Sequence, residues 1–314
     1  MDGKKGIILI ITLMVAVIAA SGCTDNTAPG ANTTTSGYPV NVTDSYDRVT
    51  TIDSQPERII SLSPSNTEIL FALGLGDRVV GNTDFCYYPE EAKNKTKVGG
   101  LTTVNVEQVI ALNPDVIFAA SLTGKDVVEN LDSMGYKVIA NDPRNATDID
   151  SIITMMGEVT GAEDNATKLM NDLDSRISAV TSKVSGIKEE DKPNVLLVIW
   201  HDPVYVAGSN CYGDDLIKLA GGRNAGAEVT DYGVMSTEAI IQADPDIIIV
   251  TVGEGGTASY DYFKNATQPW MSDLKAVKNG KVYGLDSDTI SRPGPRIANA
   301  TEAMAKVIHP ELFE

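Results

Sequence analysis

Apolar and polar positions follow the same order in two distant stretches of the chain. Residues 105–119 read NVEQVIALNPDVIFA and residues 236–250 read STEAIIQADPDIIIV, and the two align without a gap. In each stretch, apolar positions at helical spacing precede a proline, which ends a helix because it lacks a backbone N–H donor. An unbroken apolar run follows, which is typical of a fully buried strand. Each stretch therefore predicts a short helix, a turn and a strand, and the repetition indicates two similar lobes.

The same alternation of apolar strands and amphipathic helices extends over most of the chain. Residues 58–74 (RIISLSPSNTEILFALG) predict a strand, a turn rich in serine and proline, and a helix that ends at glycine. Further strands are predicted at GYKVIA, NVLLVIW and GKVYGLD. Strands that alternate with helices are typical of a parallel sheet with helices on both faces, so the pattern predicts an α/β fold.

The strand pattern stops between residues 149 and about 186. There, apolar residues recur every three or four positions, which predicts one long amphipathic helix through Leu169, Leu173, Ile177, Val180 and Val184. A final helix is expected over residues 297–308, after SRPGPR. The pattern therefore predicts an N-terminal lobe at residues 56–157, a linking helix at 158–190 and a C-terminal lobe at 191–314.

The N-terminus has the features of an export signal. Two lysines precede an apolar run at residues 6–20 that is too short to span a membrane comfortably. The sequence ASGC then ends at Cys23, so residues 1–22 are expected to be a signal peptide and Cys23 to carry lipid. A retained anchor or a plain secretory signal is the alternative, and each places the remaining chain outside the cytoplasm. Residues 23–55 are rich in Thr, Asn, Gly and Pro, which predicts a flexible tether.

Composition narrows the classes of partner and of site. The net charge of −18 argues against nucleic acid as a partner, because proteins that bind it need a basic surface.

Cys86 and Cys211 can form a disulfide or remain free buried thiols. The two histidines, His201 and His309, are too few for a structural zinc site, so no metal site is expected. N-glycosylation sequons, which an exported glycoprotein would carry, occur at Asn32, Asn41, Asn94, Asn145, Asn165, Asn265 and Asn299.

The order of these motifs resembles that of a known family. RIISLSPSNTEILFALG, YYPEEA, the two Glu/Pro–Asp units, the linking helix and SRPGPRI occur over residues 57–313 as they do in substrate-binding proteins of ABC importers for cobalamin, ferric siderophores and haem. This resemblance implies two Rossmann-like lobes joined by one long rigid helix, with the ligand in the cleft between the lobes. It also implies a monomer without catalysis or a cofactor of its own, held by lipidated Cys23 at the extracytoplasmic face of the membrane. Such a protein hands its ligand to an ABC permease dimer with cytoplasmic ATPases.

Glu107 and Glu238 occupy the same place in the two repeated stretches. In the cobalamin-binding members that the chain resembles, one glutamate on each lobe docks onto arginines of the two permease subunits. The resemblance therefore implies permease docking through Glu107 and Glu238. Capping of the helix start, or interaction with the helix dipole, is the alternative explanation for both residues.

The resemblance also implies a set of ligand contacts. The pocket walls of the cobalamin-binding members are aromatic, and the matching positions here are Phe85, Trp200 and Tyr232. Asp288 and Arg292, in the loop DSDTISRPGPR, match polar ligand contacts of those members. The structural alternatives are a core position for each aromatic residue and a salt bridge between Asp288 and Arg292.

Some positions depart from the cobalamin-binding pattern or leave the ligand open. Two wall positions that are commonly tryptophan in those members are Leu101 and Ala120 here, which weakens the case for an identical cobalamin pose. Arg292 can equally bind a siderophore carboxylate or a haem propionate, since the guanidinium fork matches a carboxylate. Arg296 is expected to begin the last helix and to brace the loop. A corrinoid such as cobalamin ranks first among the expected ligands, a ferric siderophore second and haem third.

Other function classes have weaker support in the sequence. No enzyme is expected, because G-x-S-x-G, P-loop and H-E-x-x-H motifs are absent. The feature that favours the enzyme alternative is His201, a possible general base that follows a predicted strand and precedes Asp202. A carrier for a bare zinc or manganese ion needs several converging histidine and carboxylate ligands. An adhesion protein without a ligand is the remaining alternative.

Overall fold

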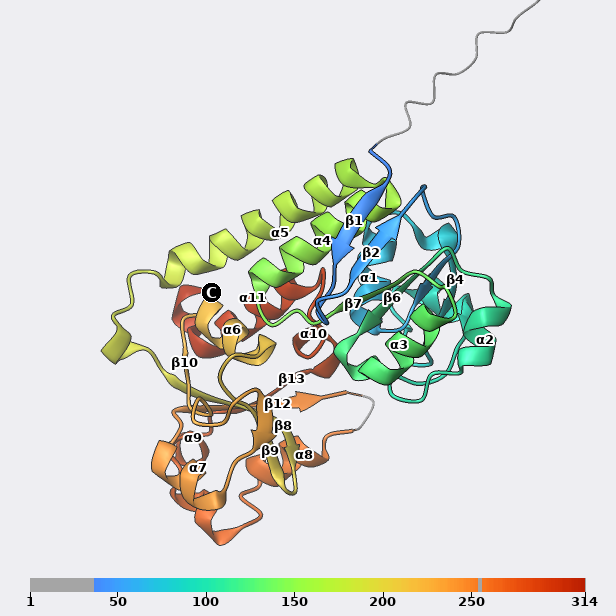
Figure 1. The fold of residues 1–314 in the computed structure, drawn as a ribbon. Helices are drawn as coiled ribbons and strands as arrows, with labels where there is room; N and C mark the ends of the chain where they lie inside the picture. The colour runs from blue at the N-terminus through green and yellow to red at the C-terminus, as the bar shows by residue number, and fades with distance from the viewer. Residues whose placement is uncertain (1–36, 254–255, 314) are drawn as a thin grey trace, which may run out of the picture. The chain divides into compact units, whose positions relative to one another are not determined.

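The computed structural model describes residues 37–253 and 256–313, which contain two α/β sheets with helices around them (Figure 1). The N-terminal sheet consists of parallel strands in the order β5-β4-β3-β6-β7. Its strands are β3 (Ile59–Ser61), β4 (Val79–Asn82), β5 (Thr96–Lys97), β6 (Val116–Ala120) and β7 (Val138–Asn141). The helices that connect them are α1 (Pro64–Ala72), α2 (Val106–Ala111) and α3 (Lys125–Ser133).

The C-terminal sheet has a parallel part and an antiparallel part. Its strand order is β11-β9-β8-β12-β13, with the short β10 beside β8. β8, β12 and β13 run parallel, whereas β9 and β11 form an antiparallel extension. The strands are β8 (Asn194–His201), β9 (Val204–Ala207), β10 (Arg223–Asn224), β11 (Tyr232–Val234), β12 (Ile247–Val252) and β13 (Val282–Asp286). The helices are α6 (Tyr212–Leu219), α7 (Thr237–Ala243), α8 (Ala258–Lys264), α9 (Lys275–Lys278) and α10 (Ser287–Ile290).

Two longer helices, α4 (Ala146–Thr160) and α5 (Glu163–Val184), connect the two sheets, and α11 (Ile297–Ile308), after the last strand, packs against α5 (Figure 1). The predicted linking segment, residues 158–190, contains the end of α4 and all of α5. Gly161, with a φ of 67°, ends α4 in the left-handed conformation and separates the two helices. α11 has the bounds that the sequence pattern predicts.

The linking layer shares its core with both lobes. α5 packs against α4, α6 and α11. Its buried face includes Leu173, Val180 and Val184, as the apolar spacing predicts. One contiguous cluster of buried side chains contains Phe118 of the N-terminal sheet and Leu197 of the C-terminal sheet. The two lobes are therefore joined by packed side chains as well as by the chain itself.

The prediction of a flexible tether over residues 23–55 is wrong for residues 40–52. These form an antiparallel hairpin of β1 (Val40–Thr43) and β2 (Val49–Ile52). Val42 and Ile52 are buried, which the mostly polar and charged residues 43–51 (TDSYDRVTT) between them conceal in the sequence. Residues 1–36, with the expected signal peptide and Cys23, lie outside the described residues, as does Asn32.

Short 3₁₀ helices complete the described structure: η1 (Gly76–Arg78), η2 (Glu90–Asn94), η3 (Ser121–Thr123), η4 (Glu189–Asp191), η5 (Pro269–Asp273) and η6 (Pro310–Leu312). Within residues 37–253 and 256–313, no helix has the length and apolar character needed to cross a membrane.

Candidate functional site

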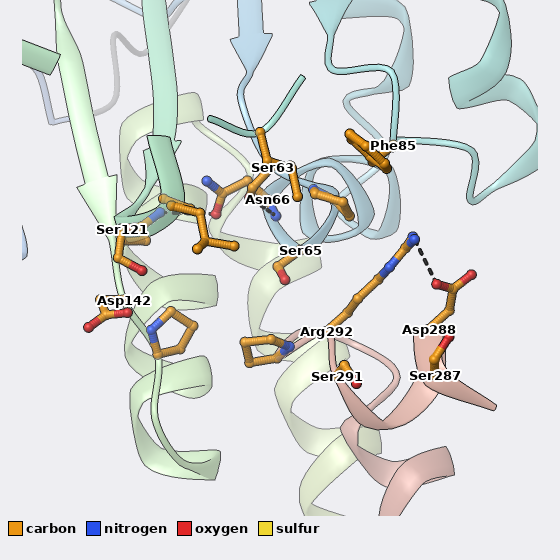
Figure 2. A pocket seen from close by; sticks show the side chains of 17 residues that line it. Ser63, Ser65, Asn66, Phe85, Ser121, Asp142, Ser287, Asp288, Ser291 and Arg292 are labelled. Carbon is orange, nitrogen blue, oxygen red and sulfur yellow. Dashed lines mark hydrogen bonds and ion pairs between the residues drawn. The ribbon is translucent and has the colours of Figure 1, made fainter. Parts of the chain in front are cut away.

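A pocket of about 290 Å³ lies where the carboxyl ends of the N-terminal strands meet the segment after β13 (Figure 2). In open α/β sheets, ligands bind at this edge because the loops that follow the strands converge there. The lining residues are Ser63, Pro64, Ser65, Asn66, Phe85, Leu101, Ala120, Ser121, Leu122, Asn141, Asp142, Pro143, Ser287, Asp288, Ser291, Arg292 and Pro293. The pocket thus draws on both lobes.

The turn between β3 and α1 builds one wall of the pocket from neutral polar groups. The Ser63 side chain caps α1 by accepting the N–H of Asn66 at 3.2 Å, and Pro64 occupies the first turn of the helix. The Asn66 side chain donates to the Ala119 carbonyl at 2.9 Å and accepts from the Asn141 side chain at 3.2 Å. These bonds hold the amide groups of Asn66 and Asn141 in place between two strand ends.

Arg292 is fixed beside the pocket by partners from both lobes. Its Nη2 lies 2.7 Å from Asp288 Oδ1 and donates to the Tyr87 hydroxyl at 2.6 Å. The same hydroxyl donates to Asp288 Oδ1 at 2.8 Å, and the guanidinium lies 4.5 Å from the centre of the Tyr87 ring. Arg292 and Asp288 therefore form the mutual salt bridge that the sequence left as an alternative, with Tyr87 of the N-terminal lobe as a third member.

A buried carboxylate lies behind this group. Glu68, on α1, is 2% exposed and receives two bonds from Arg296, at 2.8 and 2.6 Å. Arg292 Nη1 is 3.6 Å from the same carboxylate and, among the described residues, is a buried donor without a hydrogen bond. Burial raises the pKa of Glu68, against the opposing effect of Arg296 and Arg292. Arg296 begins α11 and donates to the Asp288 carbonyl at 3.1 Å, so it braces the loop as expected.

Comparison with known proteins places this arrangement in a family. The model of a family described as periplasmic binding protein matches residues 59–289, which include both α/β sheets and all pocket-lining residues except Ser291, Arg292 and Pro293. The chain belongs to the periplasmic binding protein family. The two-lobed α/β fold expected from the sequence is confirmed.

Several relatives of this periplasmic binding protein are similar over nearly the whole chain. An uncharacterised ABC transporter substrate-binding lipoprotein of Bacillus subtilis is 34% identical, with 99% of each chain covered. A cobalamin-binding protein of Halobacterium salinarum is 28% identical over 98% of this chain and 85% of its own length. The solved structure of the periplasmic heme-binding protein BhuT with two hemes has a TM-score of 0.74 at 26% identity, and the match covers 82% of this chain and 100% of that chain.

The structure brings Phe85, Asp288 and Arg292 of the predicted ligand residues together in the pocket of this periplasmic binding protein. Leu101 and Ala120, the two positions without the expected tryptophan, also line it. The sequence did not single out the other lining residues, among them Ser65, Asn66, Ser121 and Asn141. A signal for them exists in the sequence, because they lie in the segments that follow predicted strands.

Trp200 and Tyr232 do not line this pocket. Trp200 is 47% exposed at the end of β8, and its indole N–H donates to the Asp202 carbonyl at 2.9 Å. Tyr232 packs against the core, where its hydroxyl accepts the N–H of Gly213 at 3.0 Å and burial raises its pKa. Tyr232 therefore occupies the core position that the sequence left as an alternative, whereas Trp200 remains exposed.

A second polar contact joins the lobes beside the pocket. Arg144, just after β7, lies 2.9 Å from Asp142 and 3.0 Å from Asp231 of the C-terminal lobe. Nearby, the N–H of Ala146 at the start of α4 donates to Asp215 at 2.8 Å. These groups are partly exposed, so screening by solvent keeps the contribution of each pair to stability small.

Glu107 and Glu238 are exposed in the first turns of α2 and α7. The caps of these helices are made by other side chains, since Asn105 accepts the N–H of Gln108 and Ser236 accepts the N–H of Ala239. Throughout the described part of the chain, neither glutamate forms a hydrogen bond or an ion pair. Side-chain capping thus does not account for the repeated glutamates.

The remaining candidate residues have simple structural outcomes. Cys86 and Cys211 are free and buried, so the disulfide that the sequence left open is absent. In the residues that the structure describes, no group of three or more His, Cys, Asp or Glu side chains could hold a metal ion.

Proposed function

We propose that this protein is an extracytoplasmic solute-binding lipoprotein that captures a corrinoid, cobalamin in the first instance, and delivers it to an ABC permease. The pocket between the N-terminal strand ends and the Asp288–Arg292 loop carries this proposal. Membership of the periplasmic binding protein family supports the binding role. The cobalamin-binding relative supports the ligand.

The chemistry of the pocket favours a metal chelate that needs no ligand from the protein. Among the described residues that line it, no side chain offers an imidazole, thiolate, thioether or phenol group. Haem depends on such groups for its axial ligands. A corrinoid supplies most of its own cobalt ligands, and its many amide groups match the seryl and asparaginyl lining. A ferric siderophore, whose iron is also fully coordinated, is the alternative cargo, and haem follows on the strength of the haem-binding structural relative.

The proposed partners lie at the membrane. Glu107 and Glu238 would each dock on one subunit of a permease dimer, with ATPases on the cytoplasmic side. One exposed acidic residue on each lobe suits basic partners on two symmetric subunits. Lipid on Cys23 would anchor the protein, as the name of the lipoprotein relative from Bacillus subtilis supports.

Titration with cyanocobalamin tests the proposed cargo. Residues 37–314 form one unit and retain the hairpin, so they are the suitable soluble form. We expect one-to-one binding by calorimetry, with a change in the fluorescence of the exposed Trp200 if the ligand extends beyond the pocket. Failure to bind any corrinoid, together with binding of a ferric siderophore or haem, would contradict the corrinoid assignment and leave the importer role in place.

A further inference from the structure

The pocket has one cationic side chain among the described residues that line it, and that cation is already matched. Arg292 is the cation, whereas Asp142 and Asp288 are anionic. The Arg292 side chain is 12% exposed and the Asp288 side chain 24% exposed. Their 2.7 Å contact is therefore shielded from water, which strengthens it compared with a surface pair.

The geometry of this pair leaves little freedom for Arg292 to turn toward a ligand. Tyr87 both accepts from Arg292 and donates to Asp288, and its ring lies against the guanidinium. Figure 2 shows Arg292 extending along the pocket toward Asp288. The guanidinium is thus held by a carboxylate, a hydroxyl and an aromatic face at once.

The buried charges behind the pocket do not leave the charge of Arg292 available for a ligand either. The Glu68 carboxylate is occupied by both N–H groups of the Arg296 fork. Two carboxylates, Glu68 and Asp288, therefore face two guanidinium groups, Arg292 and Arg296, so that the cluster is balanced. Asp142 adds a further negative charge on the opposite side of the pocket, where Arg144 is shared with Asp231.

We propose that Asp288 is an internal counterion of Arg292 that makes the pocket select chelates with neutral polar groups over chelates that carry carboxylates. This rests on the proposed function, and it assigns a selectivity role to Asp288 instead of a simple ligand contact. A ligand carboxylate that approaches Arg292 must displace Asp288, which would then lie beside the new anion and lose its partner. An amide or hydroxyl group of the ligand meets no such penalty, and the neutral groups of Ser65, Asn66 and Ser121 can bind it.

A matched ligand pair tests this proposal: cyanocobalamin, and the monocarboxylic acid made from it by hydrolysis of one peripheral amide. We expect wild-type residues 37–314 to bind the parent about tenfold more tightly than the acid, because like charges brought together oppose binding. Asp288→Asn preserves the acceptor for Tyr87 and frees the charge of Arg292, so it should remove or reverse that preference. Calorimetry gives both dissociation constants, and circular dichroism shows that the variant is folded.

Asp164→Asn is the matched control, because Asp164 is an exposed carboxylate on α5 away from the pocket. This variant carries the same change in net charge and should keep the wild-type ratio. Equal ratios in wild type and Asp288→Asn, with the parent still bound, would overturn the counterion role and leave the corrinoid function intact. If cyanocobalamin does not bind, the same comparison with haem and its dimethyl ester decides. A wild-type preference for the ester that Asp288→Asn cancels supports the role, whereas preference for haem, or no binding at all, overturns it.

Discussion

At the scale of single residues, Asp44 shows how one carboxylate holds a segment that looks unstructured in the sequence. Asp44 accepts the N–H groups of Tyr46, Arg48 and Ala140 and pairs with the Arg48 side chain at 2.6 Å. Burial raises the pKa of Asp44, but the hydrogen bonds from Arg48 and from these N–H groups outweigh it, so that the pKa lies below its ordinary value. The β1–β2 hairpin is thereby tied to β7 of the N-terminal sheet.

Asp44→Asn should lower the stability of the protein in a pH-dependent way. A carboxylate whose pKa is lower in the folded than in the unfolded state contributes stability above its unfolded pKa, about 3.9. That contribution disappears as the pH falls through the folded pKa. We expect the variant to lose about 2 kcal/mol of unfolding free energy at neutral pH and progressively less below about pH 4. Urea unfolding at several pH values measures this, and a difference that stays constant with pH would contradict it.

At the scale of elements, the repeated Glu/Pro–Asp units perform the same structural task in both lobes. Asp115 accepts the N–H groups of Glu57 and Arg58 just before β3, both at 2.8 Å. Asp246 accepts the N–H of Asn194 at the start of β8, also at 2.8 Å. Each aspartate thus fixes the beginning of the strand that pairs with its own. The repeated aspartates are therefore explained by their hydrogen bonds to the starts of the paired strands. These bonds do not explain the repeated glutamates, which the docking proposal addresses.

Replacement of the two aspartates should have unequal effects. Asp115→Ala removes two hydrogen bonds to a charged acceptor and should destabilise the protein by about 2 kcal/mol. Asp246→Ala removes one and should cost about 1 kcal/mol. Unfolding free energies from urea titration compare the two variants. A larger loss for Asp246→Ala would show that other contacts dominate at these strand starts.

The helices α2 and α7 carry the docking proposal. Reversal of both charges, with Glu107→Lys and Glu238→Lys, should reduce ligand uptake into cells by about tenfold or more. Loss of complementary charge slows the association of two proteins by a factor of this order. Ligand affinity in solution should stay unchanged, because both residues are exposed and neither lines the pocket.

Glu158→Lys with Glu190→Lys is the control for this double variant, because both glutamates are exposed and lie outside α2 and α7. It has the same change in net charge and should leave uptake unaffected. Equal uptake by the two double variants, or a loss of ligand affinity in the docking variant, would contradict docking through α2 and α7.

At the scale of the whole molecule, the two lobes share one cluster of buried side chains, and each lobe has a further cluster of its own. The buried cluster that includes Phe118, Met156, Leu197 and Met304 continues through the linking layer. Cross-lobe ion pairs, Glu68–Arg296 and Arg144–Asp231, flank the pocket. Small relative movements of the lobes, rather than wide opening, are expected from a connection that is packed in this way.

Unfolding should therefore be a single cooperative transition. Both tryptophans, Trp200 and Trp270, belong to the C-terminal lobe, whereas far-ultraviolet circular dichroism reports on both lobes. We expect the urea transitions from fluorescence and from circular dichroism to coincide. Separate midpoints would mean that the lobes unfold independently and that the shared core contributes little to their coupling.

The sequence by itself determined the central parallel strands of both lobes, the linking helix and the last helix, and their order. The spacing of apolar residues, together with proline and glycine at helix ends, predicts the repeated helix–turn–strand units, the long α5 and the bounds of α11. The same local signals fail for the hairpin at residues 40–52, because short alternating stretches of Val, Thr and Asn resemble a polar linker. Phe85, Asp288 and Arg292 were found through the family resemblance, whereas the direction in which Tyr232 points was not predictable from its place near a strand.

The tertiary structure alone decided which groups from distant parts of the chain surround the Asp288–Arg292 pair. Tyr87 and Asp288 are 201 positions apart and Glu68 and Arg296 are 228 positions apart, so no local pattern indicates that they meet. The fold brings them together because parallel strands direct their carboxyl ends, and the loops that follow, to one edge. Local sequence determines which segments become strands and helices, but the pairing of charges depends on distances between segments, and those exist only once the lobes have packed.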